Sequence, residues 1–195
     1  MPAPATIPTP RDEALVAATR KWLQRAVIGL NLCPFARGVH AKGQVRYVVS
    51  AAQDVTALLD DLERELKLLV AARPEEVDTT LLITPEVLTE FADFVDFLDL
   101  IEVVLRTQGL AGVLQVASFH PDYVFADAEP DDIANYTNRA PYPTLHLIRE
   151  ASLARAAAAF PDAADIYQRN IETLRRLGLE GWQALEVDAP RRAGR

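Results

Sequence analysis

The segment QVRYVV at residues 44–49 has the alternation that is typical of a β-strand, with Val45 and Tyr47 on the same side of the chain. Two further short apolar segments, TTLLIT at residues 79–84 and VLQVASF at residues 113–119, are also expected to be strands. The last of them is apolar almost throughout, which favours a central strand covered on both faces.

Helical patterns fill the two intervals between these strands. Leucines recur at spacings of three and four between Leu58 and Leu69, and a second apolar stripe runs from Leu88 to Leu105. This alternation predicts an α/β fold with a short, mostly parallel sheet and flanking helices. A fourth strand is expected at residues 144–148. It could pair antiparallel, which keeps a ferredoxin-like α+β sandwich as the alternative.

A length of 195 residues is typical of one domain. We expect a single globular α/β domain over residues 10–187, with an N-terminal tail at residues 1–9 and a C-terminal tail at residues 188–195. Its first helix is expected to begin at Thr9-Pro10, because Thr caps helices and Pro is favoured in the first turn. Its last helix is expected to run from Pro161 to Gly178.

The composition excludes several classes of protein. Half of the residues are apolar and the net charge is −8, which argues against a disordered chain and against a broad nucleic-acid surface. Residues 1–10 lack the charge and the apolar stretch of a signal peptide, and no run is long enough for a membrane span. The single cysteine, Cys33, excludes an intrachain disulfide. A cytoplasmic protein with no nucleic-acid or membrane partner is therefore expected, and the sequence does not indicate its oligomeric state.

The charge is unevenly distributed. Residues 51–135 contain four Lys/Arg and nineteen Asp/Glu, whereas residues 1–50 contain seven and two. The acidic block is typical of solvated helix faces. In the basic part, Arg37 and Lys42 lie near a Cys-Pro turn together with His40 and Arg46. This cluster suggests a local binding site for a small anion.

Two interpretations of Cys33 remain open. It is either a buried small apolar residue or a nucleophile whose pKa is lowered by Arg37, His40 and Lys42. In the second interpretation, His120 would complete a Cys–His pair.

His120 follows the third expected strand, where ligands bind in open α/β sheets. It is interpreted either as a general acid/base oriented by Asp122 or as a residue that fixes a turn by bonding the backbone. A metal site with Asp122 and His146 is a further alternative, although the spacing matches no familiar metal signature, so no metal is predicted. His146, inside an apolar run, is more typical of a core histidine.

Arg139 and Asn138 close the long loop after His120. Arg139 is either a clamp for a carboxylate or phosphate or a partner of the acidic residues between Asp127 and Asp132. Tyr123 and Tyr136 would form amphipathic walls of a pocket, or they would anchor the loop.

Three functions are compatible with these residues. The first is an enzyme that acts on a small anionic substrate, with His120, Asp122 and Cys33 as catalytic groups. The second is a small-molecule or peptide binding module without chemistry, and the third is a structural or interaction protein. No cofactor is predicted, because the dinucleotide, P-loop, serine-hydrolase and zincin motifs are all missing from the sequence.

Four long motifs resemble those of the bacterial domain-of-unknown-function family 1415. They are VIGLNLCPFA at residues 27–36, KGQVRY at 42–47, LQVASFHPDY at 114–123 and NYTNR at 135–139 with PYP at 141–143 and LHL at 145–147. The resemblance covers about residues 15–182. It implies no particular activity, so no catalytic role is transferred from it.

Overall fold

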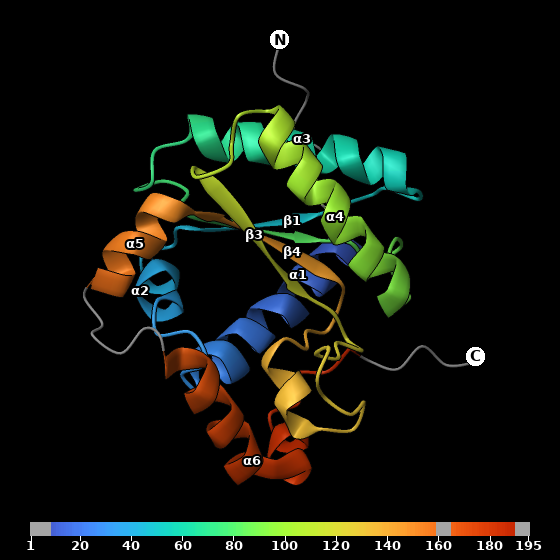
Figure 1. Ribbon diagram of the computed structural model, residues 1–195, viewed down its shortest axis with the longest axis vertical. Helices are drawn as coiled ribbons and strands as arrows, with labels where there is room; N and C mark the ends of the chain where they lie inside the picture. Colours follow the sequence, from blue (N-terminus) through green and yellow to red (C-terminus); the bar gives the residue numbers. More distant parts are fainter. Residues whose placement is uncertain (1–8, 159–164, 190–195) are drawn as a thin grey trace.

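The computed structural model describes residues 9–158 and 165–189, which form an α/β structure around a four-stranded mixed sheet (Figure 1). The strands lie in the order β1-β2-β4-β3, and their bounds are β1 Val45–Val49, β2 Thr79–Ile83, β3 Leu114–Phe119 and β4 Thr144–Arg149. The α/β class is confirmed. The mostly parallel pairing is wrong, because only β1 and β2 pair in parallel. β4 lies antiparallel between β2 and β3, as the alternative pairing of residues 144–148 allowed.

The predicted central position of β3 is also wrong. β3 pairs with β4 alone and is an edge strand, and all of its residues after Leu114 keep some accessible surface. Its apolar character has another cause. Val116 packs into the cluster on one face of the sheet and Phe119 into the cluster on the other, so both faces of the strand need apolar side chains.

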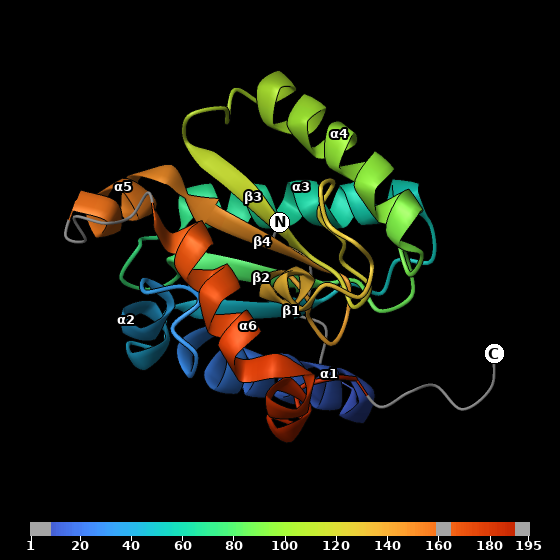
Figure 2. The ribbon, with the colours of Figure 1, turned by 60° about the horizontal axis from the view of Figure 1, so that its bottom comes forward.

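One face of the sheet is covered by α3 (Val55–Ala71) and α4 (Phe91–Thr107). Leucines of α3 and aromatic residues of α4 pack there against Leu82, Leu145 and Leu147, which are fully buried. Both helices connect strands that run in the same direction, so right-handed crossovers place them on the same face (Figure 2).

The other face carries the first and last helices. Their bounds, with those of the short elements, are α1 Pro10–Trp22, η1 Leu23–Ile28, α2 Ala36–Ala41, η2 Ile133–Thr137, α5 Glu150–Ala158 and α6 Ile166–Ala184. Thr9 caps α1 and Pro10 is its first residue, as predicted. The segment η1 is a π-helix that continues α1, and η2 is a 3₁₀-helix in the long loop.

The predicted stop of the last helix at Gly178 is wrong. Gly178 has a positive φ of 67° and bends α6, and a second helical segment continues to Ala184. The predicted helix start at Pro161 lies outside the described residues, as does most of the two predicted tails. No helix in the described part of the chain is long and apolar enough to cross a membrane.

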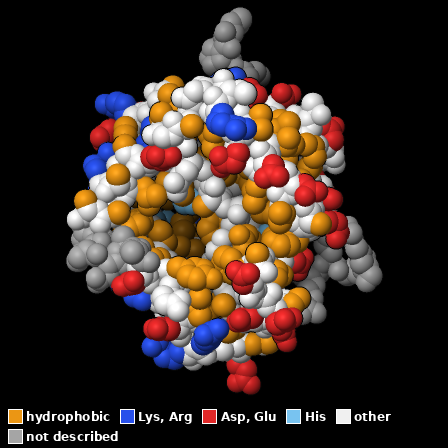
Figure 3. Space-filling model, in the orientation of Figure 1, with side chains coloured by type: hydrophobic (Ala, Val, Ile, Leu, Met, Phe, Trp, Pro, Cys, Tyr) orange, Lys and Arg blue, Asp and Glu red, His pale blue; other side chains and the backbone are white. Residues whose placement is uncertain are grey.

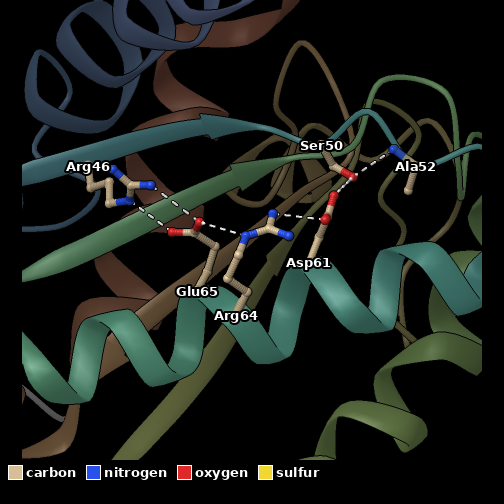
Figure 4. A network of polar contacts seen from close by, with 6 residues as sticks. All are labelled: Arg46, Ser50, Ala52, Asp61, Arg64 and Glu65. Carbon is tan, nitrogen blue, oxygen red and sulfur yellow. Dashed lines mark hydrogen bonds and ion pairs between the residues drawn. The ribbon is translucent and has the colours of Figure 1, made fainter. Parts of the chain in front are cut away.

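A polar network joins α3 to β1 (Figure 4). The guanidinium of Arg46 donates two hydrogen bonds to Glu65, at 2.8 and 3.3 Å, and the Glu65 side chain is only 2% exposed. Beside it, the Ser50 hydroxyl donates to Asp61 at 2.6 Å. A carboxylate that is buried in this way destabilises the folded protein unless a cation pairs with it.

Glu65→Ala is expected to lower the free energy of unfolding by about 1–3 kcal/mol, because the two hydrogen bonds between Arg46 and this buried carboxylate are lost. Glu63 offers a matched control on the same helix, since its ion pair with Lys67 is exposed. Glu63→Ala should cost less than about 0.5 kcal/mol. Urea unfolding measures both values, and equal losses would show that Glu65 is not held as described.

Candidate functional site

The structure brings together two of the three segments that carry the predicted site residues. The backbone N–H of His120 donates to the Asn138 carbonyl at 3.1 Å, and the Asn138 side chain donates to the Ser118 carbonyl at 3.2 Å. Arg139 Nε donates to the Tyr123 carbonyl at 3.3 Å. Residues 118–123 and 135–139 therefore form one hydrogen-bonded unit at the end of β3.

His120 is fully buried, and both of its ring nitrogens bond the backbone. Nδ1 accepts from the N–H of Asp122 at 3.0 Å, so Nε2 carries the proton and donates to the Leu88 carbonyl at 3.1 Å. The ring packs against Phe91 and Phe94 of α4, with centroids 5.3 and 5.1 Å away. Burial lowers the pKa of His120 below its usual value, and the hydrogen bond to the Leu88 carbonyl and the charge of Asp122 offset this only in part. This geometry is that of the turn-fixing interpretation.

Arg139 holds the long loop together. Its guanidinium donates to the carbonyls of Tyr123 and Pro130, the latter at 2.9 Å, and lies 4.1 Å from the centre of the Tyr136 ring. Within the described residues, Arg139 thus bonds carbonyls and a ring and forms no ion pair with the acidic residues between Asp127 and Asp132. Tyr123 packs on Phe91 and Phe125, and Tyr136 packs on Trp182.

Cys33 lies on the other side of the sheet from His120. It packs with the cluster formed by η1 and α6, whereas the His120 ring packs against α4. The two side chains are therefore not arranged as a Cys–His pair. Burial raises the pKa of the Cys33 thiol, and this effect outweighs the backbone N–H groups of Phe35 and Ala36, which lower it.

The raised pKa of the thiol agrees with the first of the two interpretations of Cys33, that of a buried small apolar residue. Arg37 donates instead to the Ile28 carbonyl at 3.2 Å, and His40 bonds Gln24 at 3.1 Å. Lys42 lies in a separate groove of about 360 Å³ beside Asp78 and Arg155. The predicted basic cluster is thus divided among different partners.

A hollow lies on the face of the sheet that is turned toward α6. β4 is paired on both sides, so its side chains can reach solvent only through a face of the sheet. Leu145 and Leu147, on the α3 and α4 side, are fully buried, whereas His146 and Ile148, on the opposite side, keep accessible surface. The exposure therefore comes from incomplete cover on the α6 side.

The packing of α6 explains this incomplete cover. α6 makes most of its contacts with η2 and not with the strands. Figure 3 shows a hollow lined mainly by hydrophobic side chains, with some histidine surface beside it, at the place where Figure 1 shows the space between α2, α5, α1 and the sheet. We call this feature the sheet hollow and define its floor by the partly exposed residues of β3 and β4 on that face, which are Gln115, Ala117, His146 and Ile148.

His146 is a polar side chain of this floor whose ring is held by a hydrogen bond. Its Nε2 lies 2.7 Å from the Thr79 hydroxyl, which donates to the Leu147 carbonyl at 2.6 Å. Burial lowers the pKa of His146 to about 4, so the ring is neutral at pH 7. His146 thus lies deep in the protein and still keeps accessible surface, as expected for a residue at the bottom of a hollow.

Tyr47 belongs to the same row of side chains across the sheet. The register aligns Tyr47 with Leu81, Leu81 with His146, and His146 with Ala117. The Tyr47 ring stacks under the Arg20 guanidinium, and its hydroxyl is buried without a hydrogen-bond partner in the described structure. Burial raises the pKa of Tyr47, with Arg20 offsetting part of the effect. A buried unpaired hydroxyl is uncommon and calls for an explanation.

Sequence reasoning missed Thr79, Ala117 and Tyr47, and it interpreted His146 as a core residue. One signal was present, because His146 stands in its strand between two large apolar residues, Leu145 and Leu147. The register that aligns them could not be read from the sequence. Over residues 9–158 and 165–189, no three His, Cys, Asp or Glu side chains are grouped so that they could hold a metal ion.

Comparison with known proteins identifies the family. A sequence model of the family described as "Protein of unknown function (DUF1415)" matches residues 14–184, which is most of the chain. The chain belongs to this family. The resemblance seen in the four motifs is thereby confirmed, and the match spans both loops and the sheet hollow. No curated protein and no solved structure matches the chain.

Arg139→Gln is expected to lower the free energy of unfolding by about 1–3 kcal/mol, because two loop carbonyls lose a charged donor. Arg175→Gln is the control, since Arg175 is exposed and 3.9 Å from Asp132. It should change stability by less than about 0.5 kcal/mol. Chemical denaturation at pH 7 measures both. An unchanged stability of Arg139→Gln would contradict the structural role of its guanidinium.

The pKa of His146 predicts a pH dependence of stability. The unfolded residue binds a proton below about pH 6.5 and the folded one only near pH 4, so stability falls as the pH decreases between these values. Wild type should lose about 3 kcal/mol more than His146→Gln between pH 7 and pH 4. Urea unfolding at several pH values tests this, and parallel pH profiles of the two proteins would refute it.

Proposed function

We propose that this protein binds a small, largely apolar molecule in the sheet hollow, without chemistry at the His120 loop. The observation that carries the proposal is the accessible surface of His146 and Ile148 on a strand that is paired on both sides. Sites for small molecules are typically concave and apolar with a few polar groups, and the sheet hollow has this composition.

The structural role of the loop residues supports binding over catalysis at the predicted site. Both ring nitrogens of His120 and the guanidinium of Arg139 bond the backbone. An acid/base group at His120 would have to give up one of these bonds, and an anion at Arg139 would compete with two carbonyls. The single cysteine and the family resemblance support a bacterial, cytoplasmic protein as part of the same proposal.

Filling the sheet hollow tests the proposal. Ala117→Leu adds apolar volume on its floor, and Ala92→Leu adds the same volume on the exposed side of α4. A panel of small aromatic and aliphatic compounds is titrated into ¹⁵N-labelled protein, and amide shifts are followed by NMR. We expect shifts around Ala117 and His146 in wild type and in Ala92→Leu. Affinity should fall at least tenfold in Ala117→Leu.

Two outcomes would overturn the proposal. The first is that no compound of the panel shifts residues of the sheet hollow in wild type. The second is that compounds bind Ala117→Leu and wild type equally well while Ala117→Leu remains folded, as judged by its amide spectrum.

A further inference from the structure

The hydrogen bonds around His146 fix the tautomer of its ring. The Thr79 oxygen lies 2.6 Å from the Leu147 carbonyl oxygen, and two oxygens this close need a hydrogen atom between them. The single hydroxyl hydrogen of Thr79 therefore goes to Leu147. The contact of 2.7 Å between Thr79 and His146 Nε2 then requires that Nε2–H is the donor. Nδ1 is left with a free lone pair.

This Nδ1 atom has no hydrogen-bond partner in the described part of the chain. It is also not one of the buried unpaired atoms there, which are Tyr47 Oη, Thr80 Oγ1, Thr137 Oγ1 and Arg149 Nε. The accessible surface of His146 lies on the α6 side of the sheet, because its strand is paired on both edges. Nδ1 is thus an acceptor that is fixed in orientation and open to a molecule in the sheet hollow.

We propose that His146 Nδ1 accepts a hydrogen bond from the bound molecule, so that the sheet hollow selects a neutral compound with a hydroxyl or N–H group over an anion. This inference rests on the proposed function and adds the class of ligand. An aligned acceptor in apolar surroundings discriminates strongly between ligands with and without a hydrogen-bond donor, because a ligand without a donor leaves the acceptor unpaired.

The charges around the sheet hollow agree with a neutral ligand. The His146 ring carries no charge at pH 7, because its pKa is lowered to about 4. Arg20, on α1, stacks on the Tyr47 ring. Arg37 and Arg139, which the sequence suggested as anion ligands, donate to backbone carbonyls. At His146 Nδ1 an anion would therefore meet a lone pair, whereas a neutral hydroxyl or N–H group can donate a hydrogen bond to it.

Three small probes separate the alternatives. Benzyl alcohol and anisole are isomers of equal size, but only benzyl alcohol has a hydrogen-bond donor, and benzoate adds an anion of similar shape. Their Kd values for wild-type protein are measured at pH 7 by NMR titration. We expect benzyl alcohol to bind about three- to tenfold more tightly than anisole, and benzoate to bind most weakly.

His146→Leu and Thr79→Val test the assigned atom. His146→Leu removes the acceptor, so benzyl alcohol and anisole should then bind with equal affinity. Thr79→Val removes the group that fixes the tautomer, so the preference should shrink while the ring remains. In wild type, the ¹⁵N resonance of His146 Nδ1 should be that of an unprotonated nitrogen and should move when benzyl alcohol is added.

The outcomes distinguish this inference from the proposed function. If anisole and benzyl alcohol bind wild type equally at the sheet hollow, binding stands and the role of Nδ1 is refuted. The same holds if the preference persists in His146→Leu, or if benzoate binds most tightly. If none of the probes and no compound of the apolar panel shifts the sheet hollow, the proposed function and this inference both fail.

Discussion

The position of β4 is the constraint on which the rest of the structure depends. Its antiparallel insertion between β2 and β3 pairs its backbone on both sides, so its side chains are fixed alternately on the two faces. Leu145 and Leu147 enter the core under α3 and α4, and His146 and Ile148 must face α6. Because α6 engages η2 in preference to the sheet, this second face is only partly covered.

The elements were largely predictable and their arrangement was not. Apolar periodicity predicted the strands near 45–49, 79–83, 114–119 and 144–148, because burial of one or both faces imposes it. The order of strands depends on pairing between distant segments, which leaves no trace in local spacing. β3 shows the difficulty, since an edge strand that contributes to two cores has the apolar run of a central strand.

The predicted site shows a second limit of sequence reasoning. A long loop without regular structure must still satisfy its backbone groups, and polar side chains do this here. His120 bonds Leu88 and Asp122, and buried Asn135 bonds the backbone of Phe125 and Glu129. Such residues have the same types and spacing as ligand-binding residues. The sequence therefore located the loops and Cys33, but it could not distinguish structural roles from functional ones. His146 lies within a strand, where its sequence pattern is that of a core residue.

The π-helix η1 has a consequence for the segment that follows it. Each π-turn contains more residues than an α-turn, so Leu23–Ile28 determines the direction in which the chain leaves the first helix. Leu32 and Cys33 join the cluster beneath α6 in that direction. Loss of one residue from η1 would restore ordinary α-helical winding and leave the direction of the exit almost unchanged, because the wide turn is what accommodates the additional residue. The wide turn therefore lets this helical segment contain one residue more than an α-helix of the same span while it still delivers Leu32 and Cys33 to the cluster beneath α6.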